Sequence, residues 1–116
     1  MKKVLLIGST TVDVTMEIDH LPGTEDDINP RSQILSLGGC ACNVAWVLKH
    51  FNVPFTLASS VGKGLYGDFA RNELNKRNIT AIHSRMEEYS KTHEEEFDII
   101  TARAVANLNV LLEISI

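Results

Sequence analysis

A glycine pair and an asparagine form the first group of residues that could do chemistry. Gly38 and Gly39 stand directly before apolar residues with helical spacing, and Asn43 lies in the first turn of that pattern. Glycine lets the main chain approach a ligand closely, and the first turn of a helix presents free N–H groups. The carboxamide of Asn43 both donates and accepts hydrogen bonds. The group indicates a pocket for a small polar ligand, although the same residues could simply make a turn and a helix end.

An acidic residue completes this group. Residues 4–7 form an apolar run that ends at Gly8, which is typical of a buried parallel strand, and Asp13 follows it closely. In open α/β sheets, ligands bind at the edge where the strands have their carboxyl ends. A carboxylate from Asp13 and a carboxamide from Asn43, brought together at that edge, would suit a molecule with several hydroxyl groups.

Strand and helix patterns alternate along the chain, which predicts a parallel sheet covered by helices. Apolar runs and helical spacing locate the elements. We expect core strands at 3–8, 55–62, 79–84 and 97–102, and helices at about 40–51, 65–78 and 103–115. Residues 12–22 and 33–37 instead predict two half-exposed strands that form a flap.

Two of these helices carry an apolar face that we expect to pack inward. The inward residues are Ala41, Val44, Ala45, Leu48 and Phe51 in the first helix and Leu65, Phe69, Ala70 and Leu74 in the second. The stretch 84–98 is acidic and weakly patterned, and we assign no helix to it.

Composition indicates an ordinary soluble domain, with 44% hydrophobic and 22% charged residues among 116. The formal net charge of −4 gives no general attraction to nucleic acid or to an anionic membrane, so we expect neither as a partner. No apolar run approaches the roughly 20 residues that a membrane-spanning helix needs, and the run after the initial lysines is too short for a signal peptide. We therefore expect a cytoplasmic protein.

Cysteines and histidines give weak signals for a metal site. Cys40 and Cys42 have no second cysteine pair to accompany them, and small residues at a packed helix start explain them more simply. The four histidines lack the spacing of metal ligands and stand at positions 20, 50, 83 and 93. We expect no bound metal.

Three stretches together resemble the amino-terminal part of the PfkB, or ribokinase-like, carbohydrate kinases. They are VLLIGSTTVDVTMEIDHLP, LGGCACNVAWVLKHF and ASSVGKGLYGDFARNELNKRNI, in the family's order and spacing over about residues 2–79. The resemblance implies a three-layer, Rossmann-like α/β fold, in which helices cover a parallel sheet and a small β lid lies near 12–37.

The resemblance also implies a substrate site. In such kinases the aspartate after the first strand and the asparagine after the glycine pair bind substrate hydroxyls. These roles correspond to Asp13 and Asn43, and Gly38 and Gly39 would line the same pocket for a sugar or a nucleoside. The lid of the family often forms a dimer contact, so we expect a homo-oligomer joined through the lid or through an open sheet edge.

The catalytic segment of the kinase family is not recognised in these 116 residues. Complete members carry a GAGD-type segment, whose aspartate takes the proton from the attacking hydroxyl and whose main-chain amides hold the phosphate charge. ATP and Mg²⁺ bind in the same half. Phosphoryl transfer depends mostly on positioning and electrostatic stabilisation. We therefore expect no catalytic residue, no cofactor and no kinase turnover in this chain alone.

A second, shorter resemblance begins near Asn78. The stretches HSRMEE and FDIITARAVANLNVLLE are similar to the middle of the GidB (RsmG) methyltransferases, which modify a guanine of small-subunit ribosomal RNA with S-adenosylmethionine. This resemblance implies that Met86 and Glu87 touch the adenine end of that cofactor and that Arg103 lies at the cofactor site. The family's glycine-rich loop and acidic ribose-binding residue are not found upstream.

The two resemblances meet at 78–80, which indicates a hybrid. Residues 1–79 would be a ribokinase-like segment, and residues 80–116 a methyltransferase-like segment that completes the same sheet. The favoured hypothesis is the substrate-binding, amino-terminal module of a carbohydrate kinase. A non-catalytic hybrid module and a fragment related to an S-adenosylmethionine-dependent methyltransferase remain open, as does the choice of sugar or nucleoside.

Overall fold

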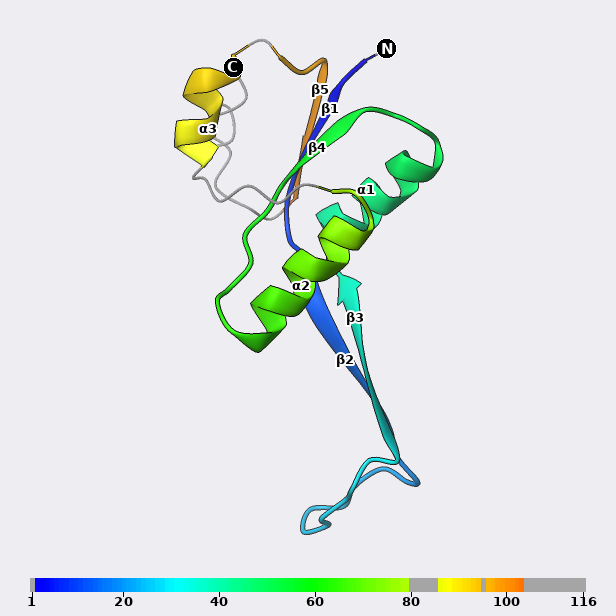
Figure 1. Cartoon of the computed structure of the whole chain (residues 1–116). Coiled ribbons are helices and arrows are strands. Elements are labelled where there is room, and N and C mark those ends of the chain that lie inside the picture. Colours follow the sequence, from blue (N-terminus) through cyan, green and yellow to red (C-terminus); the bar gives the residue numbers. More distant parts are fainter. Residues whose placement is uncertain (1, 80–85, 95, 104–116) are drawn as a thin grey trace.

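The computed structural model describes residues 2–79, 86–94 and 96–103 (Figure 1). Within these ranges the elements are, in chain order, β1 (Val4–Ile7), β2 (Thr11–Glu17), β3 (Ser32–Gly38), α1 (Cys40–His50), β4 (Phe55–Ala58), α2 (Leu65–Lys76), α3 (Met86–Thr92) and β5 (Ile99–Ala102). No helix in them is long and apolar enough to cross a membrane.

Strand β1 forms the centre of a parallel sheet. Strand β4 pairs with one of its edges and β5 with the other, each over all four residues of β1. All of β1 is buried, which explains why its sequence is a continuous apolar run. The strands predicted at 3–8, 55–62 and 97–102 are therefore confirmed, although each is shorter than expected.

Lys3 fastens the segment before β5 to the start of β1. Its main-chain N–H donates to Asp98 Oδ2 at 2.8 Å, and its carbonyl accepts from the Asp98 N–H at 3.0 Å. Its ammonium group pairs with Glu96 and lies 5.0 Å from the ring centre of Phe97. One residue therefore sets where β5 begins alongside β1.

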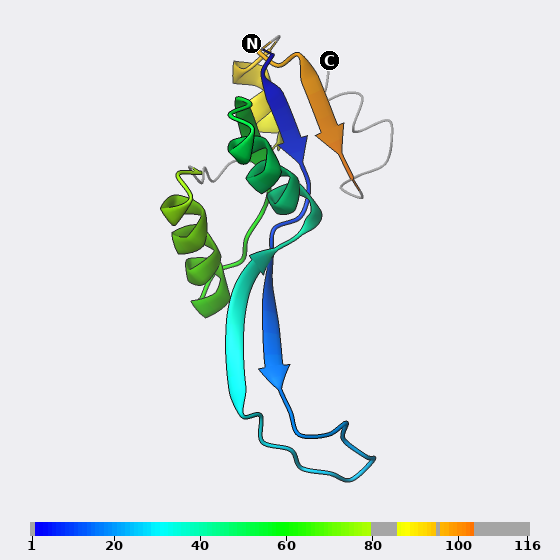
Figure 2. The same ribbon diagram turned by 90° about the vertical axis from the view of Figure 1, so that its right-hand side faces the viewer.

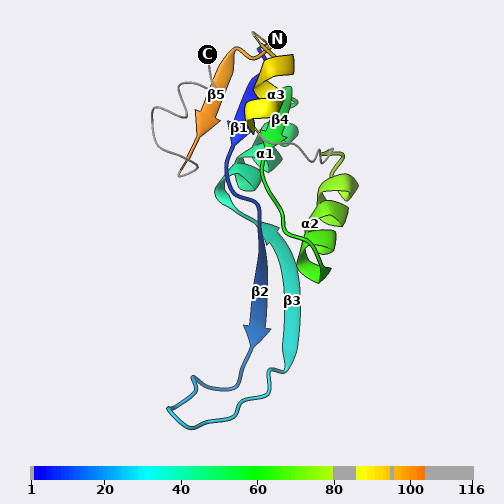
Figure 3. The same cartoon turned by 90° about the vertical axis from the view of Figure 1, so that its left-hand side faces the viewer.

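Helices lie on both sides of the sheet. Figure 1 views the strands nearly edge-on, with α1 on one side and α3 on the other, and the turned views of Figures 2 and 3 agree. Helix α2 lies beside α1, and both contribute to the core with β1. The core consists of Val4, Leu6, Leu37, Cys42, Ala45, Ala70, Leu74 and Ile79. The described residues thus form the expected three-layer α/β arrangement.

The buried face of α1 differs in part from the predicted one. Ala41, Cys42 and Ala45 are buried, the last two in the core shared with α2. The prediction that Val44 and Phe51 also point inward is wrong, because their exposed fractions are 46% and 74%. The buried stripe of α1 therefore consists of small side chains and does not include Val44.

Helix α2 shows one similar difference. Ala70 and Leu74 are buried as predicted, and Phe69 is half-buried. Leu65 is 76% exposed, so its predicted inward position is wrong. It is the first residue of the helix, and the residue after it, Tyr66, is also exposed.

Strands β2 and β3 form an antiparallel ribbon that projects away from the sheet and helices (Figure 2). They pair over all seven residues of each strand. Strand alternation puts Val12, Val14 and Met16 on one face and Asp13 and Thr15 on the other. This ribbon is the predicted flap, and it gives the molecule its long dimension of 55 Å.

Two predicted elements lie almost wholly outside the described residues: the strand at 79–84 and the helix at 103–115. Helix α3 was not predicted. Its sequence, MEEYSKT, is rich in charged and polar residues and has no apolar stripe that would indicate a packed helix.

Candidate functional site

The candidate site lies at the carboxyl edge of the sheet, where β1 leads into the ribbon and the ribbon returns to α1. Gly39 makes the turn into α1 with a φ of 97°, which lies in the left-handed region that favours glycine. A Cβ on Gly39 would lie 2.8 Å from the main-chain carbonyl carbon of Ser9. Both its conformation and this close approach therefore require a glycine at position 39.

Asp13 lies against the first glycine of the pair. A Cβ on Gly38 would come within 2.9 Å of the carboxyl carbon of Asp13. Thr11 Oγ1 donates a hydrogen bond to Asp13 Oδ1 at 3.2 Å, and the Asp13 side chain is exposed. The missing side chain at Gly38 therefore lets the carboxylate lie over the main chain at the base of the ribbon.

Asn43 lies one turn into α1 and is exposed. Its main-chain N–H donates to the Gly39 carbonyl at 2.9 Å, and the Cys40 N–H donates to Ser9 Oγ at 3.3 Å. Ser9 thus satisfies the N–H of Cys40, one of the free N–H groups in the first turn of α1. The described contacts link Asn43 to the glycine pair through the first helical turn, whereas the Asp13 carboxylate approaches the pair directly.

Arg103 reaches the same edge from the other end of the chain. It directly follows β5, which is parallel to β1, so the two strands end on the same side. Arg103 Nη1 donates to Cys40 Sγ at 3.6 Å. Met86 and Glu87, which the methyltransferase resemblance grouped with Arg103, begin α3 on the other side of the sheet from α1 (Figure 1). The described contacts therefore tie Arg103 to the start of α1.

The hydroxyl residues at this edge were missed by the sequence analysis. Ser9 accepts a hydrogen bond from the Cys40 N–H, and Thr11 donates one to the Asp13 carboxylate. Thr10 Oγ1 and Ser59 Oγ are buried and have no hydrogen-bond partner among the described residues. The available signal was the Gly-Ser-Thr-Thr stretch directly after the buried run of β1, since hydroxyl side chains at a strand end readily contribute to a polar site.

The two cysteines lie in different environments. Cys42 is buried and Cys40 is exposed. Burial raises the pKa of the Cys42 thiol above its ordinary value, against a smaller lowering by the Arg77 guanidinium, so this thiol stays protonated near neutral pH. In residues 2–79, 86–94 and 96–103, no group of three or more His, Cys, Asp or Glu side chains could hold a metal ion.

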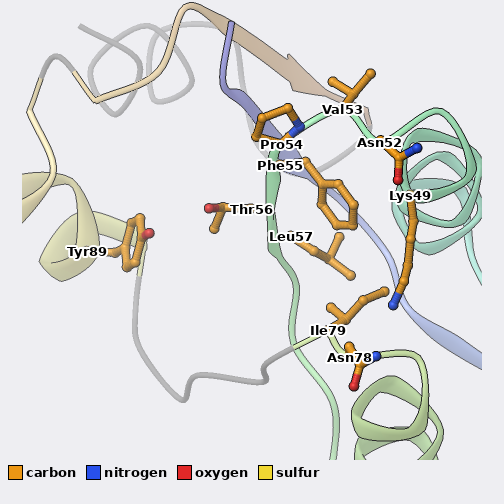
Figure 4. Close-up of a pocket in the computed structure, with 10 residues that line it drawn as sticks. All are labelled: Lys49, Asn52, Val53, Pro54, Phe55, Thr56, Leu57, Asn78, Ile79 and Tyr89. Atoms are coloured by element: carbon orange, nitrogen blue, oxygen red, sulfur yellow. The ribbon is translucent and has the colours of Figure 1, made fainter. Parts of the chain in front are cut away.

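A cavity of about 480 Å³ lies beside β4, on the side away from β1 in the described part of the chain (Figure 4). Phe55 and Leu57 point toward α1, whereas Thr56 points toward Tyr89 of α3 across the opening. This cavity has mixed polar and apolar walls and includes none of the predicted sugar-site residues.

A second cavity, of about 350 Å³, lies between the apolar face of the ribbon and α2. Val12, Val14 and Tyr66 contribute to its wall. Asp13 belongs to the opposite face of the ribbon, so the predicted sugar site is an open surface on that face and not part of this cavity.

A family model described as pfkB family carbohydrate kinase matches residues 1–108, a range that includes the ribbon, the glycine pair and β5. The chain belongs to the pfkB family of carbohydrate kinases. It is 36% identical over 92 residues to the ATP-dependent ribose-1-phosphate kinase of Halopiger xanaduensis, which covers 79% of this chain and 31% of that kinase. The kinase resemblance is therefore confirmed.

Two further comparisons bear on the fold and on the second resemblance. A crystal structure of a protein assigned as a phosphofructokinase of Staphylococcus aureus superposes with a TM-score of 0.58 and 21% identity, covering 68% of this chain and 26% of that one. The fold is thus ribokinase-like. Over 42 residues, or 36% of this chain, the sequence is 52% identical to 18% of the ribosomal RNA small subunit methyltransferase G of Thermotoga petrophila. This chain spans less than a third of each of these proteins.

Gly39→Ala should lower the free energy of unfolding by about 2 kcal/mol, because alanine meets the Ser9 main chain and must keep a positive φ. Gly62→Ala is the matched control, since a Cβ there meets open space, and it should cost less than about 0.5 kcal/mol. Urea unfolding followed by circular dichroism measures both. Equal stabilities of the two variants would show that the junction does not need glycine.

Proposed function

We propose that this chain is the substrate-binding part of an ATP-dependent kinase for a sugar or a nucleoside. The observation that carries the proposal is the approach of the Asp13 carboxylate to Gly38, directly before the start of α1. Family membership and the similarity to a ribose-1-phosphate kinase support a sugar-like substrate.

Asp13 and Asn43 would hold the hydroxyl groups of the substrate. Asp13 Oδ1 takes a hydrogen bond from Thr11, which leaves Oδ2 to accept one from a ligand hydroxyl. The exposed carboxamide of Asn43 can donate to one hydroxyl and accept from another. The missing side chains at Gly38 and Gly39 let the Asp13 carboxylate and the Ser9 main chain lie against the chain there, which keeps Asp13 next to the start of α1.

The proposed role of these residues ends at binding. Phosphate transfer needs a base for the attacking hydroxyl and positive groups around the transferred phosphate. No motif of the family's catalytic segment occurs in these 116 residues, so that segment, with its ATP and Mg²⁺, would have to lie outside them. Dependence on ATP favours the cytoplasm as the site of action.

A hybrid origin is the second proposal, and the methyltransferase similarity favours it. In a hybrid, Met86, Glu87 and Arg103 would come from the methyltransferase parent while the sugar site comes from the kinase. Calorimetric titration with S-adenosylmethionine tests whether cofactor binding survives. Binding that is lost in Arg103→Ala would favour the methyltransferase function over the kinase one, and absence of binding would leave a hybrid without that activity.

Asp13→Asn and Asn43→Ala should each weaken sugar binding by at least about tenfold, because the first replaces a charged acceptor with a neutral one and the second removes the carboxamide that bonds a ligand hydroxyl. Isothermal titration with ribose, fructose and adenosine measures this. Asp27→Asn in the loop of the ribbon and Asn72→Ala on α2 change the same residue types at exposed positions and should leave binding unchanged. Failure of all three ligands to bind would refute the proposed function.

The 116-residue chain should not consume ATP when the sugar that it binds is added, because its residues bind the sugar without supplying the catalytic base. A coupled assay for ADP, run with a complete pfkB-family kinase as positive control, measures this. Sugar-dependent ADP release that disappears in Asp13→Asn would show that catalysis is encoded within these residues.

Self-association through the lid is also proposed. On the apolar face of the ribbon, Val14 is 41% and Met16 is 52% exposed. Both residues belong to β2, which pairs only with β3 in the described part of the chain. The ribbon therefore presents exposed apolar side chains together with an unpaired strand edge. A second copy that covers this face would bury them.

Met16→Glu should therefore shift the protein toward monomer, because it places a charge in the apolar contact. Thr15→Glu adds the same charge on the opposite face of the ribbon and should leave the assembly unchanged. Sedimentation velocity over a range of concentrations measures the change. A wild-type protein that stays monomeric throughout would contradict self-association.

A further inference from the structure

The cavity beside β4 gathers three polar side chains that have no partner in the described part of the chain (Figure 4). We propose that it binds a small aromatic carboxylate, whose charge pairs with Lys49 and whose ring packs against Phe55 and Leu57. The wall of the cavity includes the start of β4, whereas the Asp13 carboxylate lies beyond the end of the parallel strand β1. The proposed site is therefore at the opposite edge of the sheet from the sugar site and does not depend on it.

Lys49 supplies the positive charge of the cavity. Its side chain is half-buried and makes no ion pair or hydrogen bond with any residue that the structure describes. It runs from α1 toward the turn at Asn78 (Figure 4). The described residues of the wall include no Asp or Glu that could neutralise it. A half-buried ammonium group without a counterion favours an anionic ligand, because a charge-assisted hydrogen bond offsets the cost of its burial.

Two carboxamides are held at the same cavity by the ends of α1 and α2. Asn52 and Asn78 follow these ends with positive φ angles of 53° and 54°. In both helices a main-chain N–H just past the end bonds back to a carbonyl of the last turn, at 3.0 Å for Val53 and 2.9 Å for Ile79. These bonds fix the two asparagines, whose side chains have no hydrogen-bond partner within the described ranges. Each carboxamide can therefore donate an N–H to a carboxylate that pairs with Lys49.

The apolar part of the wall determines the body of the ligand. Phe55 and Leu57 are half-buried and point toward α1, which is the helix that carries Lys49 (Figure 4). The cavity volume of about 480 Å³ lies within the range of small-molecule sites, roughly 300–1,000 Å³. A flat ring can pack against the Phe55 ring while its carboxylate reaches the ammonium group. An aromatic carboxylate therefore uses both the apolar and the polar parts of the wall.

A matched pair of probes tests this inference, since indole-3-acetate and indole-3-acetamide share one ring and differ in charge. Titration of the isotope-labelled 116-residue chain, followed by amide NMR, measures both the affinity and the place of binding. We expect indole-3-acetate to shift the side-chain signals of Asn52 and Asn78. It should bind at least about tenfold more tightly than the amide, because only the acid pairs with Lys49. Acetate, which lacks the ring, should bind at least about tenfold more weakly than indole-3-acetate.

Variants of the wall separate its parts. Lys49→Gln should remove the preference for the charged probe. Asn52→Gly and Asn78→Gly should each weaken its binding by about threefold or more, because glycine keeps the positive φ and removes only the carboxamide. Lys63→Gln and Asn72→Ala remove the same groups at exposed positions outside this cavity and should leave binding unchanged. Thermal unfolding checks that every variant is folded.

Four results would overturn the inference: no binding of either indole probe, equal binding of the two, a preference for the acid that survives Lys49→Gln, or signal shifts that lie away from the cavity. Acetate that binds as tightly as indole-3-acetate would overturn the aromatic class, because the apolar wall would then contribute nothing. Each of these results leaves the proposed sugar site standing, since sugar binding is measured separately with variants of Asp13 and Asn43.

Discussion

The close approach of Gly39 to the Ser9 main chain is the constraint on which the rest of the site depends. The chain leaves β1, runs out and back along the ribbon, and must pass Ser9 again before α1 can begin. Only a residue without a Cβ fits there with a positive φ. Position 39 therefore fixes where α1 starts, and so places the Cys40 N–H against Ser9 and the Cys40 thiol at the edge of the sheet.

This junction lies between two charged side chains, those of Asp13 and Arg103. On one side, Thr11 and Gly38 hold the Asp13 carboxylate at the base of the ribbon. On the other side, the start of α1 meets Arg103. Strand alternation in the ribbon keeps Val12 and Val14 toward α2 and puts Asp13 on the opposite face.

Local patterns were enough to predict much of the fold. The buried run of β1, the alternation in the ribbon and the helical spacing after Gly39 and Gly64 all depend on near neighbours in sequence. The direction of a helix face depends on what it packs against, which the sequence of α1 alone does not give, and Val44 is exposed. The contact between Arg103 and Cys40 could not be predicted, because it requires knowing which edge of β1 pairs with β5.

The pairing of β5 also explains how a segment of other origin could complete the sheet of the proposed hybrid. Only Ile100 of β5 is half-buried, and the other three residues are exposed. Main-chain hydrogen bonds, which do not depend on side-chain identity, therefore provide most of the attachment of β5 to β1. Lys3 fixes where the pairing of the two strands begins. The register pairs Ile7 with Ala102, so the next residue, Arg103, is level with Gly8 and one residue from Ser9. Register alone thus brings a guanidinium to the start of α1.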